Sequence, residues 1–431
     1  MAAPHHRGGP LMSQTPPVGH GTTARPKVGG RWFALFTIAW LLIWTVQLTP
    51  LQLLLPLQLD TSETAGGWVD GVVFSGLVLG VGGLAGVIAG PLAGALSDRQ
   101  TGLRARRRPY ALAGVWLTAL CLVLTGLASG PLTIGAAWVG VSVGVSIASA
   151  ALTAMIADQL PVSQRGAASS AASSAQAVGI VVGVGTVVLA GLGVLDGYLV
   201  LAISMAVLGT ACALLLPDPS GRRFVEGSSG LAVRGSGARR LAFLYDRNFR
   251  WMLIGRLVVN VGNALGTALF LFFLMYGLGQ PHDEAEGNLL LVIVVYTVFV
   301  VAASVVAGVI TDRHGGRRGF TVAAALVQAL SGVVIVASPT FTTTLIAAAL
   351  MGVGYGAFMT VGLAFATDLL PSERDHARDL GVVNVVAALG QLLGPVIGAG
   401  LVALVGGFWL VFAAAAVLSV VGAGLTALAN K

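Results

Sequence analysis

Charged side chains are scarce in this 431-residue chain, where Asp, Glu, Lys and Arg together make up only 10% of the residues. Soluble domains carry about 25% charged residues. Hydrophobic residues make up 56% of this chain, and its mean hydropathy is +0.89. The composition excludes a water-soluble domain and indicates an integral membrane protein.

Cysteine is almost absent, and both copies, Cys121 and Cys212, lie inside long apolar runs. This excludes a disulfide framework, and we expect both to be small core residues. The N-terminal residues 1–31 lack the apolar core of a signal peptide and are predicted to form a disordered tail. His5 and His6 stand in that tail without a further ligand nearby, so we expect no metal site and no cofactor.

Long apolar runs recur along the rest of the chain without the period-two alternation of membrane strands, which excludes a β-barrel. We therefore predict an all-α integral membrane protein with twelve transmembrane helices in two pseudo-symmetric six-helix bundles. The predicted spans are 32–58, 71–96, 110–129, 133–157, 167–191, 197–217, 250–278, 288–311, 320–338, 342–367, 381–404 and 407–429. The predicted domains are a cytoplasmic tail (1–31), an N-terminal bundle (32–217), a cytoplasmic linker rich in Gly, Ser and Arg (218–249) and a C-terminal bundle (250–431).

The basic residues lie on one side of this topology. All 24 lysines and arginines fall in the tail, in the loops that follow the even-numbered spans, or at the C-terminus, except Arg256, which lies near the start of the seventh span. The opposite loops carry acids instead: Asp60, Glu63, Asp70, Asp196, Asp283, Glu284 and Glu286. We therefore predict a multi-pass protein of the cell membrane, and the positive-inside rule places both of its termini on the cytoplasmic side. The net charge of +7 needs no nucleic-acid partner.

The two halves of the sequence repeat each other. The second span ends in Gly94, three residues and Asp98-Arg99, and the eighth ends in Gly308, three residues and Asp312-Arg313. An Asp-x-x-Pro sequence follows the fourth and the tenth spans, at Asp158 and Asp368, and Gln176 of the fifth span matches Gln391 of the eleventh. Such ordered matches predict parallel structural repeats, as in many secondary transporters.

These residues resemble the major facilitator superfamily of secondary transporters, whose signature is Gly-x-x-x-Asp-Arg followed by a basic cluster. The loop from Ser97 to Tyr110 is similar to that of the sucrose and glycoside-pentoside-hexuronide symporters, although Ala105 stands where these usually have Gly. The resemblance implies a transporter and not an enzyme. It also implies that Asp98 latches against the start of the eleventh span near Gly381, and symmetry extends this to Asp312 near Gly166. Anchoring of the arginines to anionic lipid is the alternative. The predicted gating residues are Asp98, Arg99, Arg106, Arg107, Arg108, Asp312, Arg313, Arg317 and Arg318.

Glycines recur every fourth residue in the second span, at Gly82, Gly86, Gly90 and Gly94, and the eleventh span has a similar series from Gly390. Small residues at this spacing let helix backbones approach closely, so we expect these stripes to be helix interfaces.

Polar and aromatic residues within the spans are candidates for the substrate site, which in this architecture lies near the midplane between the halves. Amides can donate to and accept from a hydroxyl-rich solute, and aromatic faces suit sugar rings or flat drugs. An interhelical hydrogen bond is the alternative role of each. The candidates are Trp44, Gln47, Gln52, Gln176, Asn260, Asn263, Tyr355, Asn384 and Gln391.

No Asp, Glu, Lys or His lies in the middle of a span. Proton-coupled transporters normally keep such a group there, so coupling would use an acid at a helix end, such as Asp60 or Asp70, or the protein would be a facilitator. Arg256 is the one intramembrane charge, and we expect its side chain to snorkel to the cytoplasmic surface more readily than to contact an anionic substrate.

The sequence therefore predicts a monomeric alternating-access transporter for a small solute, with a sugar or glycoside favoured. Multidrug or small-molecule efflux is the alternative. The predicted partners are the solute, the lipid bilayer and a coupling proton or sodium ion.

The predicted latch at Asp98 is open to a direct test. Asp98→Asn removes the charge and should shift the protein away from its outward-facing state, because that state depends on cytoplasmic closure. A cysteine introduced into the outer vestibule reports the shift by its labelling, and unchanged labelling would contradict the latch.

Overall fold

A computed structural model describes residues 27–61, 67–99, 107–217, 246–369 and 376–429, and all regular structure in these ranges is helical. The first half contains α1 (Gly30–Thr49), the π-helical turn η1 (Pro50–Leu54), α2 (Leu55–Gln58), α3 (Gly67–Arg99), α4 (Arg108–Leu127), α5 (Pro131–Gln159), α6 (Val162–Leu189), α7 (Val194–Ser204), the π-helical turn η3 (Met205–Gly209) and α8 (Thr210–Leu215). The second half contains α10 (Arg247–Ala268), α11 (Phe270–Phe272), the π-helical turn η5 (Phe273–Gly277), α12 (His282–His314), α13 (Arg317–Ala337), α14 (Phe341–Asp368), α15 (His376–Val405) and α16 (Trp409–Leu428).

The predicted all-α membrane fold is confirmed. In the described ranges eleven helices are long and apolar enough to cross a membrane, and α10 with α11 and η5 forms a twelfth span that bends by 45°. The sequence predicted one continuous helix there. The bend coincides with Leu269, whose φ of −112° and ψ of 13° leave the helical range, and with the following π-helical turn. Cys121 and Cys212 are free and buried, as expected.

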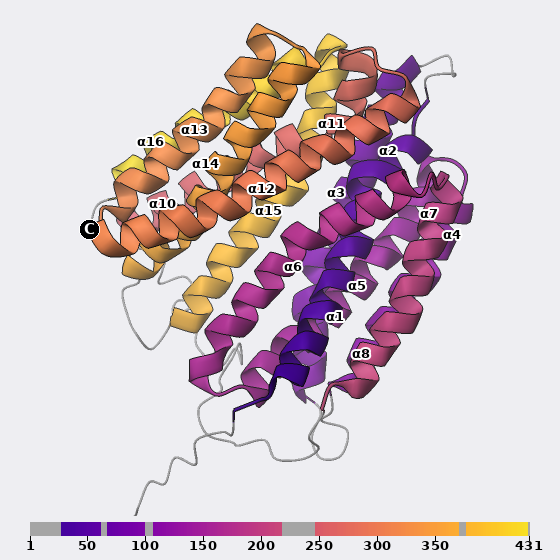
Figure 1. Ribbon diagram of the computed structural model, residues 1–431, viewed down its shortest axis with the longest axis vertical. Coiled ribbons are helices and arrows are strands. Elements are labelled where there is room, and N and C mark those ends of the chain that lie inside the picture. The colour runs from indigo at the N-terminus through magenta and orange to yellow at the C-terminus, as the bar shows by residue number, and fades with distance from the viewer. Residues whose placement is uncertain (1–26, 62–66, 100–106, 218–245, 370–375, 430–431) are drawn as a thin grey trace, which may run out of the picture.

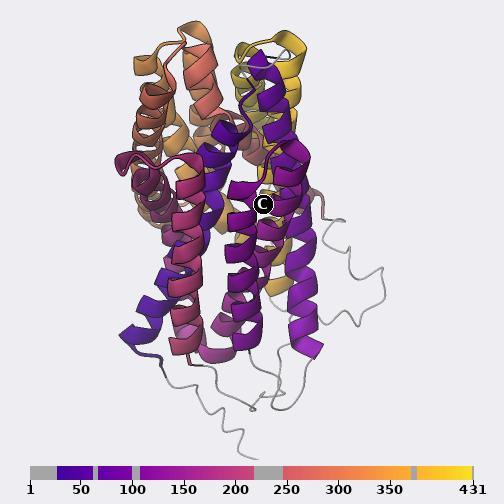
Figure 2. The same ribbon diagram turned by 90° about the vertical axis from the view of Figure 1, so that its right-hand side faces the viewer.

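The helices form two groups. In Figure 1 the indigo to magenta helices of the first half lie beside the orange to yellow helices of the second. Figure 2 shows the long helices running roughly along the long axis of the molecule. We call the end where α2 stops and α3 and α12 begin the acidic side, after its loop residues, and the opposite end, where α3 and α12 stop, the basic side. The main contacts between the groups join α3 to α15 and α6 to α12.

Close contacts between α3 and α15 lie at glycines in the half of α3 nearer the acidic side. A Cβ atom at Gly76 would lie 2.8 Å from the Pro395 carbonyl oxygen, and one at Gly80 would overlap Val396 Cγ2. Nearer the basic side, a Cβ atom at Gly90 would meet nothing within 4 Å. The two halves therefore pack closely at Gly76 and Gly80, whereas α3 has open space around Gly90.

The predicted glycine stripe of the second span is an interface at two of its four positions, and there it joins α3 to α5. Gly82 faces Trp138 and Gly86 faces Ser146, both on α5 of the same half, whereas Gly90 and Gly94 have open space. A four-residue repeat marks one face of a helix, but it does not identify the neighbour that covers that face.

Close packing at Gly80 yields a paired prediction. Gly80→Val should overlap Val396 and disfavour the arrangement described here by about 1–3 kcal/mol, because overpacking forces neighbours apart. Gly90→Val makes the same chemical change in open space and should have little effect. Electron–electron distances between spin labels at the exposed positions Asp196 and Glu284 should lengthen in the first variant only. Equal distances in both variants would contradict the interface.

Candidate functional site

A chain of hydrogen bonds joins three of the predicted site residues. Tyr355 on α14 donates its hydroxyl to Asn260 Oδ1 on α10 at 3.3 Å, and Gln391 Nε2 on α15 donates to the Tyr355 oxygen at 3.4 Å. Asn260 is fully buried, whereas Gln391 is exposed. We call these three residues the amide–tyrosine cluster. It extends from the interior of the second half to an exposed side chain.

A second pair extends this cluster. The Tyr296 hydroxyl of α12 donates to Asn263 Oδ1 at 3.3 Å, and the Tyr296 and Tyr355 rings stack with centroids 6.5 Å apart. Asn263 was predicted as a site residue, but Tyr296 was not, because the eighth span was not expected to line the path. Its signal in the sequence is a lone tyrosine in a run of valines, a residue type that needs a partner for its hydroxyl when buried.

Glycine permits the close approach that builds the cluster. A Cβ atom at Gly390 of α15 would lie 2.5 Å from Asn260 Cβ, and one at Gly394 would overlap the Ala264 side chain on the next turn of α10. Because these positions lack side chains, α15 packs directly against α10 and brings Gln391 within reach of Tyr355. The predicted glycine interface of this span is confirmed at these two positions.

The candidates of the first half do not join the cluster. Trp44, Gln47 and Gln52 are half-buried along α1 and η1, and Gln176 is exposed on α6. The Trp44 ring stacks on Trp40, and its buried Nε1 has no hydrogen-bond partner among the described residues. Asn384 lies on α15, but its side chain is outside the described set. The symmetric pair of Gln176 and Gln391 therefore differs, since only Gln391 contacts another candidate.

Arg256 does not snorkel, and the sequence expectation was wrong. Its side chain is 2% exposed and donates from Nη2 to the Met359 sulfur of α14 at 3.4 Å. Its Nε and Nη1 atoms are buried without a hydrogen-bond partner in the described part of the chain. Arg256 stands nine residues after the first residue of α10, which puts it about 13 Å into the helix. The guanidinium contacts α14 and is not exposed at the surface.

At the acidic side, one carboxylate joins the two halves. Asp60, which follows α2, accepts from the Tyr276 hydroxyl at 2.6 Å and lies 3.0 Å from His282 Nε2. Tyr276 belongs to η5 and His282 begins α12, so both partners come from the other half. The Asp60 side chain is only 8% exposed. Hydrogen bonds to a carboxylate are stronger than those between neutral groups, which makes this a substantial contact between the halves.

Stacked rings cover the same contact. Trp68 at the start of α3 stacks on Tyr276, with centroids 5.1 Å apart, and on Phe408, with centroids 5.3 Å apart. Phe408 directly precedes α16 of the second half. We call Asp60, Trp68, Tyr276, His282 and Phe408 the acidic-side closure. The sequence suggested Asp60 as a coupling acid, but its partners are distant in the chain and no local pattern joins them.

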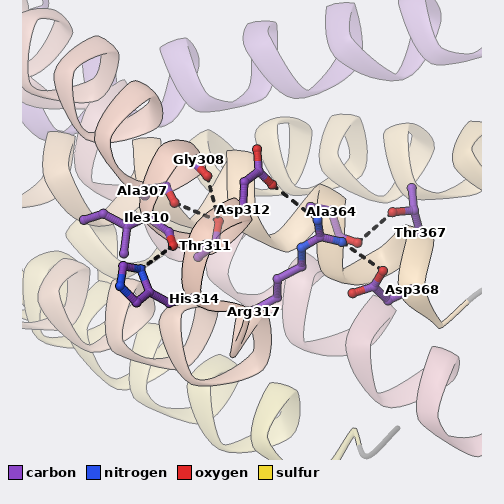
Figure 3. A network of polar contacts seen from close by, with 10 residues as sticks. All are labelled: Ala307, Gly308, Ile310, Thr311, Asp312, His314, Arg317, Ala364, Thr367 and Asp368. Atoms are coloured by element: carbon purple, nitrogen blue, oxygen red, sulfur yellow. Dashed lines mark hydrogen bonds and ion pairs between the residues drawn. The ribbon is translucent and has the colours of Figure 1, made fainter.

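On the basic side the predicted gating residues form ion pairs within each half. Arg107 Nε lies 2.9 Å from Asp158 Oδ2, and Arg317 Nη1 lies 2.9 Å from Asp368 Oδ1. Both residues of the second pair are offset by 210 residues from those of the first, so the sequence repeat is also a repeat of contacts. Figure 3 shows Arg317 between Asp368 and Asp312, whose carboxylate is 3.4 Å from Nη2.

Two of the remaining gating arginines donate to backbone carbonyls at helix ends. Arg108 donates to the Leu214 and Leu216 carbonyls at 2.9 and 3.1 Å, and Arg318 donates to the Ala427 carbonyl. Arg313 is exposed. The side chains of Asp98 and Arg99, all of Arg106 and the surroundings of Gly381 are outside the described set, as are His5 and His6. A Cβ atom at Gly166 would meet nothing within 4 Å, so the predicted latches stay predictions for another conformation.

Metal-binding side chains do not gather among the described residues, where no group of three His, Cys, Asp or Glu is placed to hold an ion. The charged groups that the structure brings together at the basic side are Arg107 with Asp158, and Arg317 with Asp368 and Asp312.

The acidic-side closure makes a second prediction. Asp60→Asn should weaken the bonds to Tyr276 and His282 and reduce the closed population on the order of tenfold, because neutral hydrogen bonds are weaker than charged ones. Spin labels at Asp196 and Glu284 should move apart. Asp70→Asn, at an exposed acid on the same side, is the matched control. Closure that persists unchanged in the first variant would show that Asp60 does not hold it.

Comparisons with known proteins identify the family of the chain and proteins that share its fold. The sequence matches the model of the Major Facilitator Superfamily over residues 35–293 and 263–429. The multidrug resistance protein MdtL of Shewanella oneidensis is 32% identical over 129 residues, which cover 29% of this chain and 32% of that relative's length. The chain thus spans about a third of the curated relative that it matches.

Solved structures of transporters share the whole fold. An inward-facing, unoccupied structure of a bacterial homologue of the human lysosomal transporter Spinster has a TM-score of 0.70 at 17% identity, covering 93% of this chain and 98% of that one. A mutant of the nucleoside transporter NupG has a TM-score of 0.71 at 15% identity, covering 93% and 100%. A D-xylose–proton symporter has a TM-score of 0.68 at 15% identity, covering 93% and 97%. The chain belongs to the Major Facilitator Superfamily, and it is a multi-pass membrane transporter and not an enzyme.

Proposed function

We propose that this transporter binds a small polar solute at the amide–tyrosine cluster and moves it by alternating access. The observation that carries the proposal is the chain of hydrogen bonds from buried Asn260 through Tyr355 to exposed Gln391. At 3.3 and 3.4 Å, these bonds are longer than typical O–H···O and N–H···O hydrogen bonds. A solute hydroxyl can therefore replace them with little loss to the protein.

The conformation supports a state open to the basic side. Asp60, Trp68 and their partners hold the halves together at the acidic side, while Gly90 and Gly166 face open space toward the basic side. Because the arginines and lysines mark the cytoplasmic face, we assign the basic side and both termini to the cytoplasm. The described conformation is then inward-facing, and transport requires the acidic-side closure to open.

A sugar or glycoside fits the cluster best. Amide groups offer donors and acceptors to hydroxyls, and the Tyr296 and Tyr355 rings offer faces to a pyranose or an aromatic aglycone. The loop from Ser97 to Tyr110 supports the sucrose and glycoside-pentoside-hexuronide branch through its sequence. Efflux of drugs is the second candidate, and it rests on the MdtL similarity over 129 residues.

For coupling, Asp60 is a better candidate than Asp70. Its carboxylate contacts both Tyr276 and His282 of the other half, whereas Asp70 is exposed on α3. A coupling proton or sodium ion at Asp60 would change the contact that holds the halves together. We propose a monomer as the transporting unit, because each chain contains both halves of the path.

Thermal unfolding of the purified protein tests the solute class. A ligand that binds only the folded state raises the midpoint, so mono- and disaccharides, cationic amphipathic drugs and organic anions are compared in one panel. A shift with a sugar supports the proposal. A shift with cationic drugs alone would transfer the assignment to efflux.

Tyr355→Phe tests the cluster itself. The variant loses the hydroxyl that joins Asn260 to Gln391 and should weaken solute binding by about tenfold or more, because a site built for hydrogen bonding is left unpaired. Tyr198→Phe is the matched control, since the Tyr198 hydroxyl is fully buried in the first half without a partner in the described chain. Affinities follow from the midpoint shift against ligand concentration. Equal affinity in both variants would remove Tyr355 from the site.

A further inference from the structure

Arg256 is a buried cation for which the described protein supplies no anion. Two of its nitrogens, Nε and Nη1, have no hydrogen-bond partner, and the third contacts only the sulfur of Met359. Gly362 of α14 lies close to the guanidinium, since a Cβ atom at that position would be 3.3 Å from Nη1. None of the ion pairs in the described ranges includes this guanidinium.

Such a group is costly as a structural element. A thioether is a weak acceptor, and a buried charge left without a counterion destabilises the fold. An apolar side chain of similar length would fill the same space without this penalty. The guanidinium therefore matches a site that is complete only when an anion occupies it.

The position links Arg256 to the amide–tyrosine cluster. Asn260 lies one turn further along α10 and donates from Nδ2 to the Arg256 carbonyl at 2.8 Å. On the facing helix α14, Met359 lies one turn beyond Tyr355. Arg256 and Met359 therefore form the next layer of the same α10–α14 contact, on the basic side of Asn260 and Tyr355.

We propose that Arg256 binds an anionic group, a carboxylate or a phosphate, of the transported solute, while the cluster binds its hydroxylated part. This inference rests on the proposed function, because it adds a charge to a solute bound at the same site. Guanidinium presents its donors in a planar fork that matches both anions bidentately. The Met359 sulfur contacts Nη2, and a methionine side chain is flexible enough to yield this position to an anion.

The experiment compares two ligands that differ in one substituent, which is charged in the first ligand and neutral in the second. Phenyl β-D-glucuronide and phenyl β-D-glucoside share the ring and aglycone, and the first carries a carboxylate where the second carries a hydroxymethyl group. Inorganic phosphate and phosphatidylglycerol are added separately, because a free anion or a lipid headgroup presents the same chemistry. Midpoints of thermal unfolding are measured on the full chain in detergent at constant ionic strength.

Three variants address Arg256, and a fourth is the control. Arg256→Gln removes the charge, Arg256→Lys keeps it without the fork, and Arg256→Met gives an apolar side chain of similar length. Arg247→Gln removes an exposed charge from the first turn of the same helix.

The wild type should bind the glucuronide or inorganic phosphate at least tenfold more tightly than Arg256→Gln and Arg256→Met do, with Arg256→Lys between them. The glucoside should bind the wild type and all Arg256 variants alike, and Arg247→Gln should match the wild type throughout. Without ligand, Arg256→Met should unfold at a higher temperature than the wild type, because the unpaired charge is gone. A purely structural arginine predicts the opposite shift.

Anion binding that is the same in the wild type and Arg256→Gln, or no anion binding in the wild type, would overturn the inference. A response to phosphatidylglycerol alone would overturn it too, by assigning Arg256 to lipid. The proposed function fails separately: it is lost if Tyr355→Phe leaves the binding of every ligand in the panel unchanged, whatever Arg256 does.

Discussion

Every polar group inside a bilayer must find its partner within the protein, and this constraint shapes each half of the molecule. Where the partner is present, the contact joins helices, as in the bond from the Tyr296 hydroxyl of α12 to Asn263 of α10. Where the described protein supplies no partner, as at Nε and Nη1 of Arg256, we propose that a solute completes the network.

The contacts at the two ends of the molecule differ in kind: those at the acidic side join the two halves, and those at the basic side join helices within one half. At the acidic side, glycine at Gly76 and Gly80 lets α3 and α15 touch, and Asp60 adds directed bonds that can break and reform. Within each half, the ion pairs of the basic side join neighbouring helices and keep each bundle rigid. Two rigid halves with a reversible contact between them provide the physical basis of alternating access.

Much of the fold was predictable because hydropathy, charge asymmetry and the internal repeat are local signals in the sequence. Asn260, Tyr355 and Gln391 were found because amides and aromatics are rare within apolar spans. The bend at Leu269 had no marker such as proline, and the partners of Asp60 lie more than 200 residues away. Arg256 was misread because distance from the helix end was taken as the guide, whereas the direction of its side chain is set by tertiary packing.

The most direct test of alternating access at this site is the accessibility of one residue from both sides of the membrane. Gln391→Cys, with Cys121 and Cys212 replaced by alanine, is labelled in oriented vesicles by an impermeant thiol reagent added to either side. We predict strong labelling from the basic side. Labelling from the acidic side should increase in Tyr276→Phe, which lacks the hydroxyl that bonds Asp60. Labelling from the basic side alone, unchanged in that variant, would contradict the account.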